Sequence, residues 1–381
     1  MNPVETAAGF AAEIRRRAPE IEQHRRMPGD LANRMAGAGL FRLLVPELYG
    51  GLQVEPLAFF ETLKETARAD GAVGWCQMIG VTTGMMAASL PDEWSRTIYG
   101  CNPDTITSGV TAPLGIAVAE GDGLRVSGRW PFGSGCEVSD WICGGCQLME
   151  DGEPRKNRFG SPEIALVFFP ADDVTIHDTW HTSGLCGTGS HDIEVKDAEV
   201  PAGRWVTMGK RARVDAPLYR FPTLGLLALG VSAVALGIAE HAIEAFTTLA
   251  RDKVPTGSAR PLSARSGAQR DLARAMAAVQ SAAALTREAI EDAWGEAHRE
   301  GSLGLETKAR LRLAATNNAW SAAEAVDLLY HAAGGSSIYA HSALQRCFRD
   351  VHVATQHLMV AQPIYEVVGK VALGIDPKTL L

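Results

Sequence analysis

Hydrophobic residues recur at helical intervals through the first hundred positions of the chain. Spacings of three and four residues place these positions on one face of a helix and the polar ones on the other. The pattern predicts helices over residues 5–26, 30–40, 56–69 and 72–90, with a Gly-rich turn before the VPELYGG stretch. We expect these helices to form an amino-terminal helical domain over residues 1–103.

Short apolar runs replace the helical pattern near residue 104. GIAVAEGDGLRVSGRW is typical of two strands joined by a Gly-Asp-Gly turn, and WICGGCQLM, EIALVFFP and DIEVKDAEVP are typical of further strands. Polar loops containing Gly and Pro separate them. Residues 104–206 are therefore predicted to form a β domain.

Long helical patterns return after a linker over about 207–222, and they cover residues 223–251, 267–300, 305–333 and 341–371. Ala-rich stretches such as ARAMAAVQSAAAL suit close packing between helices. We expect residues 207–381 to form a four-helix bundle, which gives the chain as a whole an α+β architecture.

One run in the third domain, residues 224–239, is apolar enough to raise the possibility of a membrane span. It is shorter than a span requires, contains three Gly and a Ser, and continues into Glu240, His241 and Glu244. The amino terminus carries acidic and basic residues from its start and has no apolar core of a secretory signal. We therefore expect a buried bundle helix, no membrane association, and a cytoplasmic location that keeps the seven cysteines reduced.

Composition and charge narrow the possible partners. A chain of 381 residues, 46% apolar and 21% charged, is long enough for two or three packed units. Its net charge of −8 gives no reason to expect a nucleic-acid partner.

Several motifs for metals or nucleotides are incomplete. Cys143 and Cys146 have CxxC spacing, but no second pair accompanies them, and an extended strand sends their side chains to opposite faces. No Glu is followed three positions later by His, so the Glu-x-x-His motif of di-iron bundles is absent. GTGSHD at 187–192 lacks the third glycine of a dinucleotide fingerprint. We expect neither a metal site nor a Rossmann domain.

The last predicted helix carries RCFRDVHVATQH, in which His352 and His357 are candidate site residues. They lie five residues apart, about 140° around a helix, so both cannot enter one metal site. One of them could face a functional site while the other packs in the core or faces solvent. Trp75 and the methionines near it could likewise line an apolar pocket or belong to the core.

The stretch RWPFGSGC at 129–136 concentrates two aromatics, a Pro, two Gly and a Ser at the end of a strand. By itself it is either a tight turn pinned by aromatics or a loop that contacts a ligand. Together with SGLCGTGSHDIEVKDAEVP, AAGG near residue 334 and LQRCFRD near the carboxy end, it resembles the acyl-CoA dehydrogenase fold. The resemblance covers nearly the whole chain. It implies an amino-terminal helical domain, a β-barrel-like domain and a four-helix bundle, with flavin between the last two.

The resemblance also implies flavin contacts. In that fold the loop matching residues 132–135 lies against the isoalloxazine ring, its hydroxyl residue reaches N5, and its glycines let the backbone approach. HAAGGSS at 331–337 is similar to a segment that approaches the flavin pyrophosphate or adenine from a neighbouring subunit. TSGVTAPLG stands where the dehydrogenases commonly carry TEP. The implied contacts are Trp130, Phe132, Gly133, Ser134, Ser108, Gly334 and Gly335, with Arg251, Lys253 or Arg265 as basic candidates for the phosphates.

One position separates two branches of this fold. Most of the dehydrogenases carry a catalytic glutamate nine positions after the Arg of the RD motif, where this chain has Leu358. The chain is more similar to the two-component flavin monooxygenases, which take reduced flavin from a separate NAD(P)H-dependent reductase, add O2 at C4a and transfer one oxygen atom. This resemblance implies FADH2 or FMNH2 as the cofactor. It also implies that His357 helps to form or hold the flavin hydroperoxide and that Ser134 slows its loss as hydrogen peroxide.

Several phenol hydroxylases of this branch carry a second His on the helix after a GW motif, where this chain offers Thr82 or Thr83. That departure favours an electron-rich aromatic substrate that needs no deprotonation, such as an indole, while a phenol, a sulfur or an amine centre stays open. The resemblance further implies a homo-oligomer, a tetramer or dimer, whose subunits complete each other's flavin sites. An acyl-CoA dehydrogenase with a displaced base and a non-catalytic flavin-binding scaffold are the alternatives. The expected substrate pocket comprises Trp75, Met78, Thr82, Met86 and His352.

Overall fold

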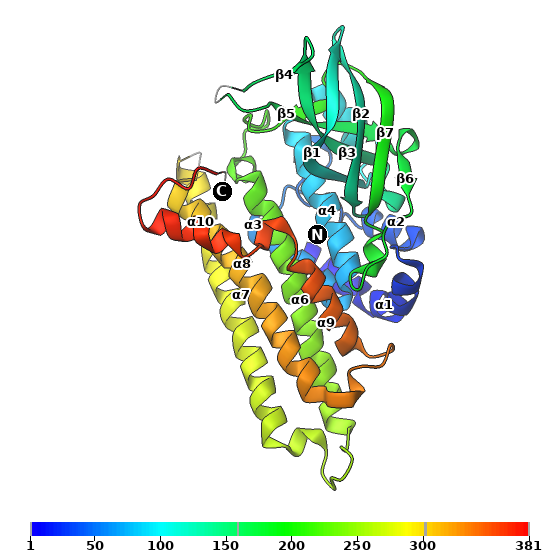
Figure 1. The fold of residues 1–381 in the computed structure, drawn as a ribbon, viewed down its shortest axis with the longest axis vertical. Helices are drawn as coiled ribbons and strands as arrows, with labels where there is room; N and C mark the ends of the chain where they lie inside the picture. Colours follow the sequence, from blue (N-terminus) through cyan, green and yellow to red (C-terminus); the bar gives the residue numbers. More distant parts are fainter. Residues whose placement is uncertain (1, 158–159, 301–302, 380–381) are drawn as a thin grey trace.

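The computed structural model describes residues 2–157, 160–300 and 303–379 (Figure 1). Helices occupy the chain up to Gly100, strands lie between Thr107 and Thr207, and helices resume at Thr223. Figure 1 shows the sheet at one end of the molecule and three long helices running away from it. The predicted α+β order is confirmed.

The amino-terminal helices begin at residues that favour helix starts. Pro56 opens one of them, where its missing N–H costs nothing, and the Asp70 carboxylate caps the next by accepting from the N–H groups of Ala72 and Val73. The last of the predicted helices, 72–90, is shorter than expected, because a 3-10 turn follows Gly84. The helices of this part are α1 (Pro3–His24), α2 (Gly29–Gly37), α3 (Pro56–Ala69), α4 (Gly71–Gly84) and α5 (Asp92–Ser95).

The strands form one sheet in the order β6-β7-β2-β1-β3-β5-β8, with β4 paired to β3. All pairings are antiparallel except that of β1 with β3. The predicted hairpin is confirmed, since β1 and β2 meet with Ile116 opposite Ser127 and Glu120 opposite Gly123. The strands are β1 (Thr107–Glu120), β2 (Gly123–Gly133), β3 (Trp141–Glu150), β4 (Glu153–Pro154), β5 (Ile164–Pro170), β6 (Thr175–His177), β7 (His191–Val200) and β8 (Trp205–Thr207).

The long helices α6 (Thr223–Asp252), α7 (Ser266–Glu300) and α8 (Leu305–Ala333) match the prediction closely. Helix α6 is long and apolar enough to be a candidate membrane span, but 78% of its most apolar window is buried in the protein. It is the core helix of the bundle, because it packs against α3, α4, α8 and α9.

The prediction of one continuous helix over 341–371 is wrong. The segment forms α9 (Ala343–Ala354), a 3-10 turn called η10 (Leu358–Val360), and α10 (Pro363–Ala372). Pro363 rules out a continuous helix here, because inside a helix it could not donate to the carbonyl of Met359, although α9 itself ends earlier, at Ala354. Pro363 stands instead at the start of α10.

Buried apolar residues form separate cores in the helices and beneath the sheet. One cluster of buried apolar residues runs from α3 and α4 through the long helices to α9, and a second fills the space beneath the sheet. Cys143 belongs to the first and Cys146 to the second, so the two thiols point to opposite faces as predicted. Among the described residues, no group of three or more His, Cys, Asp or Glu side chains could hold a metal ion.

Candidate active site

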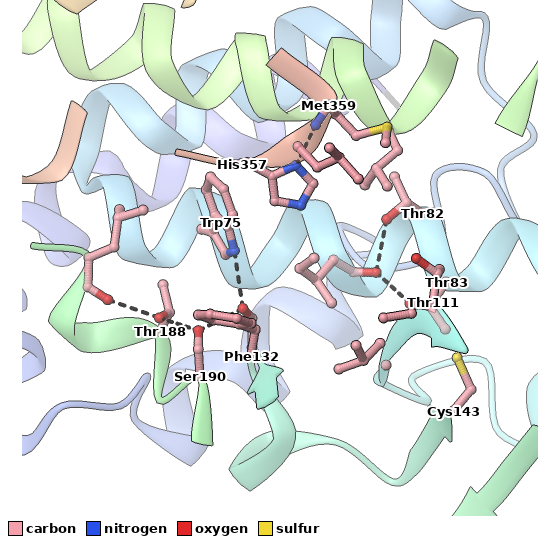
Figure 2. A pocket seen from close by; sticks show the side chains of 18 of the residues that line it. Trp75, Thr82, Thr83, Thr111, Phe132, Cys143, Thr188, Ser190, His357 and Met359 are labelled. Carbon is pink, nitrogen blue, oxygen red and sulfur yellow. Dashed lines mark hydrogen bonds between the residues drawn. The ribbon is translucent and has the colours of Figure 1, made fainter. Parts of the chain in front are cut away.

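A cavity of about 460 Å³ opens between the sheet and the helices. It is lined by residues of α4 and the 3-10 turn after it, β1, the end of β2, β3, β5, the loop over residues 180–190, the start of α6, and the end of α9 with the turn after it. Its wall is mostly apolar, with hydroxyl groups of Ser and Thr and one His among aromatic and aliphatic side chains (Figure 2). None of the described lining residues is Arg, Lys, Asp or Glu.

The RWPFGSGC stretch bends Ser134 into this cavity. The register of β2 against β7 shifts between Trp130 and Gly133, and Phe132 adopts a left-handed backbone with φ of 67°. This bulge turns the strand end away from the sheet. As a result Phe132 lies 65% exposed along the cavity, edge-on to Trp180 at 6.2 Å, while Ser134 is only 4% exposed.

Ser134 belongs to a chain of three hydroxyl groups, which we call the hydroxyl chain: Ser134, Ser190 and Thr188. The oxygens of Ser134 and Ser190 lie 2.6 Å apart, as do those of Ser190 and Thr188. The Thr188 hydroxyl donates to the carbonyl of Leu185 at 2.9 Å, and the indole N–H of Trp75 donates to Ser134 at 3.1 Å. These bonds join α4, the end of β2 and the 180–190 loop at one point.

His357 enters the cavity from the turn after α9 rather than from a helix. Its Nδ1 accepts the N–H of Met359 at 3.2 Å, so the proton of the neutral ring sits on Nε2. Figure 2 shows this second nitrogen turned away from Met359 and toward the cavity. The ring lies edge-on to Trp75, with 5.6 Å between centroids. Burial, with a further effect of the Arg312 charge, lowers the pKa of His357 to about 4, which keeps the ring neutral near pH 7.

Two side chains of α8 hold the turn that carries His357. Arg312 is 2% exposed and donates to the carbonyl of Met359 at 3.0 Å, the acceptor that Pro363 cannot serve. The indole of Trp320 donates to the carbonyl of the next residue, Val360, at 2.9 Å. Met359 is therefore bonded at both ends of its backbone, to His357 and to Arg312.

The expected substrate pocket is reproduced only in part. Trp75, Thr82 and Met86 line the cavity. Met78 does not, because it is fully buried against α6 near Gly230. His352 also lies outside the lining, since its Nε2 pairs with Asp327 of α8 at 2.8 Å. The premise of a 140° separation from His357 does not hold, because the helix ends before His357.

Several residues expected to contact flavin lie behind the cavity wall. Trp130 is 1% exposed in the core beneath the sheet, and its indole donates to the carbonyl of Gly145. Gly133 faces β7, where an added Cβ would lie 2.8 Å from Ile193. Ser108 pairs in register with the core residue Ile142, and its buried hydroxyl finds no partner in the described chain. None of the three lines the cavity.

The other expected cofactor contacts lie at the far end of the bundle. Thr223 lines the cavity at the start of α6, and Arg251 lies 28 positions further along the same helix, roughly 40 Å away. Lys253 donates to the carbonyl of Ala333, which places the exposed Gly334 and Gly335 at that far end too. Arg265 is exposed in the loop between α6 and α7, at the opposite end from the sheet (Figure 1). Within one chain these residues cannot reach the cavity.

The sequence reasoning missed Thr188 and Ser190. Their motif, GTGSHD, lacks the third glycine of a dinucleotide fingerprint, and within SGLCGTGSHDIEVKDAEVP it supported the family resemblance without assigning a role to either hydroxyl. Two hydroxyl residues two positions apart beside a glycine turn were the available signal. Asp350 of α9 was not among the expected site residues; it is 6% exposed and accepts from the N–H of Leu185.

The cavity suits a flat ring that combines apolar faces with hydrogen-bonding edges. Trp75, Phe132 and Trp180 offer aromatic surface, and Gly109 leaves backbone exposed on the β1 side. Ser134 has one acceptor position left after its two bonds, and His357 presents an N–H. The donor set and the shape of the wall fit an isoalloxazine ring.

Family models and known proteins resemble the chain over most of its length. Residues 4–92 match the acyl-CoA dehydrogenase N-terminal domain, and residues 229–362 match the acyl-CoA dehydrogenase C-terminal domain. Indole-3-acetate monooxygenase of Pseudomonas putida is 33% identical over 95% of this chain and 91% of its own. The flavin-dependent monooxygenase oxygenase subunit HsaA of Mycobacterium tuberculosis is 28% identical over 96% of this chain and 93% of its own.

A solved structure extends the likeness to the whole fold. XiaF from Streptomyces sp., in complex with FADH2 and glycerol, superposes with a TM-score of 0.91 at 25% identity, over 99% of this chain and 96% of its own. The matched family models, the relatives over nearly full length and the cavity lead to one conclusion. The chain belongs to the acyl-CoA dehydrogenase family and, within it, to the flavin-dependent monooxygenases.

Proposed function

We propose that this oxygenase hydroxylates an uncharged aromatic compound of the indole class, with Ser134 and His357 as the polar groups nearest the reaction. The observation that carries the proposal is the neutral lining of the cavity, in which no described residue is charged. A carboxylate buried there would lack a cationic partner, and burying an unpaired charge is costly. Indole-3-acetate monooxygenase is a relative, so the charge of the substrate is the point at which this chain would differ.

Reduced FAD or FMN, supplied by a separate reductase, would supply the two electrons that activate O2, of which one oxygen atom goes to the substrate and the other leaves as water. The residues of the chain do the rest. Ser134 accepts a hydrogen bond from the ring edge, while the Nε2–H of His357 stabilises negative charge that develops during oxygen transfer. Trp75 separates the two groups and helps to exclude water. Thr82 and Thr83 donate to carbonyls of their own helix, and a threonine hydroxyl is not basic enough to deprotonate a phenol.

The dehydrogenase alternative is disfavoured by the same lining. Abstraction of an α-proton from an acyl thioester needs a carboxylate at the ring, and no described lining residue supplies one. Leu358, at the position of the usual base, is 73% exposed and apolar.

The protein is also proposed to act as a homo-oligomer in the cytoplasm. Gly334, Gly335 and Arg251 lie roughly 40 Å from their own cavity, so a role at flavin requires the cavity of another copy. Exposed apolar residues near this end, Ile338 and Tyr339, suit a contact between subunits. The free, mostly buried thiols suit a reducing compartment.

The substrate proposal is tested by comparing indole with indole-3-acetate. Purified protein is supplied with a flavin reductase, NADH and FAD or FMN, and the hydroxylated product is measured by chromatography. We expect kcat/KM for indole to exceed that for indole-3-acetate about tenfold or more, because the carboxylate finds no partner. Preference for the acid would overturn the proposed substrate class. Anaerobic bleaching of oxidised flavin by an acyl-CoA would instead support a dehydrogenase.

A further inference from the structure

The hydroxyl chain has only one direction that uses every contact in it. A carbonyl oxygen has no proton to give, so Thr188 must donate its single hydroxyl proton to Leu185. Ser190 must then donate to Thr188, and Ser134 must donate to Ser190. The indole N–H of Trp75 is a donor only, so Ser134 accepts from it.

This count leaves one unused position on Ser134, and that position is a lone pair. At the far end, the Leu185 carbonyl is shared by three donors: the Thr188 hydroxyl, the indole N–H of Trp180 at 3.2 Å and the backbone N–H of Thr188 at 3.1 Å. Toward the cavity, therefore, Ser134 can accept a hydrogen bond but has no proton to offer. A chain running the other way would give up the bond from Thr188 to Leu185 and turn a Ser134 proton into the cavity.

We propose that Thr188 and Ser190 make the site selective for the redox state of the flavin, by holding Ser134 as an acceptor. The inference rests on the proposed flavin site at Ser134. The central ring nitrogen N5 carries a proton in reduced flavin and only a lone pair in oxidised flavin. If Ser134 can only accept, it receives the N5–H of reduced flavin, whereas oxidised flavin would place its N5 lone pair against a lone pair of Ser134. Reduced flavin therefore binds more tightly.

The two residues act through Ser134 and are positioning residues. Thr188 is 1% exposed and Ser190 4% exposed, and both line the cavity wall next to Ser134. Changing either one alters the proton that Ser134 presents, while Ser134 itself stays in place. This separates their effect from that of losing the Ser134 hydroxyl.

The test measures the dissociation constants of oxidised and of reduced FAD by anaerobic titration and takes their ratio, oxidised over reduced. FMN is titrated in parallel. Thr188→Val removes the fixed end of the chain, and Ser190→Ala frees the Ser134 proton to turn toward the flavin. We expect each variant to lower the ratio of oxidised to reduced dissociation constant about tenfold, the effect of one hydrogen bond, and to shift the two-electron potential of bound flavin by about 30 mV in the negative direction. Thermal unfolding of each variant shows that it is folded.

Thr83→Val is the matched control. Thr83 lines the same cavity, but its hydroxyl donates to Ile79 within α4 and takes no part in the hydroxyl chain. We expect this variant to leave the ratio within about twofold of the wild type. An unchanged ratio in folded Thr188→Val and Ser190→Ala variants, or a wild type with no preference, overturns the inference. A wild type that binds neither form of flavin would instead refute the proposed site itself.

Discussion

At the scale of single residues, the cavity depends on a few polar groups placed in an apolar wall. Ser134 and His357 come from segments that are neither helix nor regular strand. Each is fixed by bonds to its neighbours, Ser134 by the hydroxyl chain and Trp75, His357 by the backbone of Met359. Groups held in this way lose little freedom when a ligand binds, so their replacement should affect chemistry more than folding.

Ser134→Ala should leave the fold nearly intact and increase the loss of oxidising equivalents as hydrogen peroxide. The variant removes the acceptor opposite the flavin ring and leaves Trp75 and Ser190 each without one partner. A lost buried hydrogen bond of about 1–3 kcal/mol corresponds to a change of roughly tenfold or more in the ratio of peroxide to product. The ratio is measured by peroxide assay and product chromatography in the same reaction. Unchanged coupling would exclude this role for Ser134.

Replacements of His357 separate hydrogen bonding from proton transfer. His357→Ala should lower coupling about tenfold, since the Nε2–H donor is lost, while His357→Asn keeps a donor and should retain more product. Because the pKa of His357 is lowered to about 4, the ring stays neutral through pH 6–8, and coupling should not change with His357 titration in that range. An Asn variant as poor as Ala would favour proton transfer. His352→Ala is the control, since His352 faces Asp327 and should leave coupling close to the wild type.

At the scale of elements, the turn after α9 owes its position to α8. Arg312 donates to the carbonyl of Met359, which Pro363 leaves without a helical donor, and Trp320 donates to the carbonyl of Val360. The free Nε of Arg312 has no partner among the described residues, so its charge is not neutralised nearby. The turn is therefore held by a buried cation that also disfavours protonation of His357.

Arg312→Met should loosen the turn and raise the pKa of His357, because both the bond to Met359 and the positive charge are removed. Arg312→Lys keeps the charge and should preserve more of the low pKa than Met does. Nitrogen NMR of labelled histidine reports the tautomer and the pKa directly. Trp320→Phe removes a neighbouring bond without changing charge, and a pKa shift as large as that of Arg312→Met would contradict the electrostatic account.

Asp350 links α9 to the loop that carries the hydroxyl chain, by accepting the N–H of Leu185. Burial and the nearby Asp70 raise the pKa of Asp350 to about 7, against the attractions of Arg346 and Arg349. Between about pH 4 and 7 the folded protein thus holds a proton that the unfolded chain releases, so this group lowers stability as pH rises through that range and has no further effect above it.

Asp350→Asn should make the stability of the protein less dependent on pH between about 4 and 7. It keeps an acceptor for Leu185 and removes the charge, so the melting temperature should fall by a few degrees less between pH 5 and 8 than in the wild type. Calorimetry at several pH values provides the measurement. The exposed Glu324 on α8 gives a control, since Glu324→Gln should not alter the slope. An identical slope in Asp350→Asn would contradict the assignment.

At the scale of the whole molecule, one chain presents a cavity at one end and its Gly-Gly segment at the other. Helix α10 carries valines and an isoleucine, yet none of its residues is buried. Apolar side chains that a chain leaves only half-buried are suited to contact between subunits. We expect the protein to migrate as a dimer or tetramer in size-exclusion chromatography with light scattering.

Mixing variants tests whether subunits share flavin sites. Gly335→Trp should block the far end of the bundle, while Ser134→Ala impairs the cavity, so each alone should show poor coupling. Refolded or co-expressed mixtures should recover part of the activity, because some sites then combine an intact cavity with an intact Gly-Gly segment. A monodisperse monomer that binds reduced flavin tightly would contradict a flavin site shared between subunits.

The fold could be predicted from the sequence because its elements are marked locally. Helical spacing gave α3, α6 and α8 nearly to the residue, and the Gly-Asp-Gly turn gave the β1–β2 hairpin. Ser134 and His357 were found through a family resemblance, and the cavity contains both. Trp130 and Met78 were misplaced because an aromatic or a methionine is equally suited to a pocket and to a core.

The sequence by itself determined the order of helices and strands, the apolar character of α6 and the presence of hydroxyl residues in GTGSHD. Only the tertiary structure decided which of these polar groups meet. Ser134 and Ser190 are 56 residues apart, and Arg312 and Met359 are 47 apart, yet each pair is hydrogen-bonded. Periodicity encodes which face of an element is buried, because burial depends on neighbours within a few residues. The direction of a hydrogen-bond chain depends on which donors and acceptors distant segments bring together, and that is fixed only when the sheet packs against the helices.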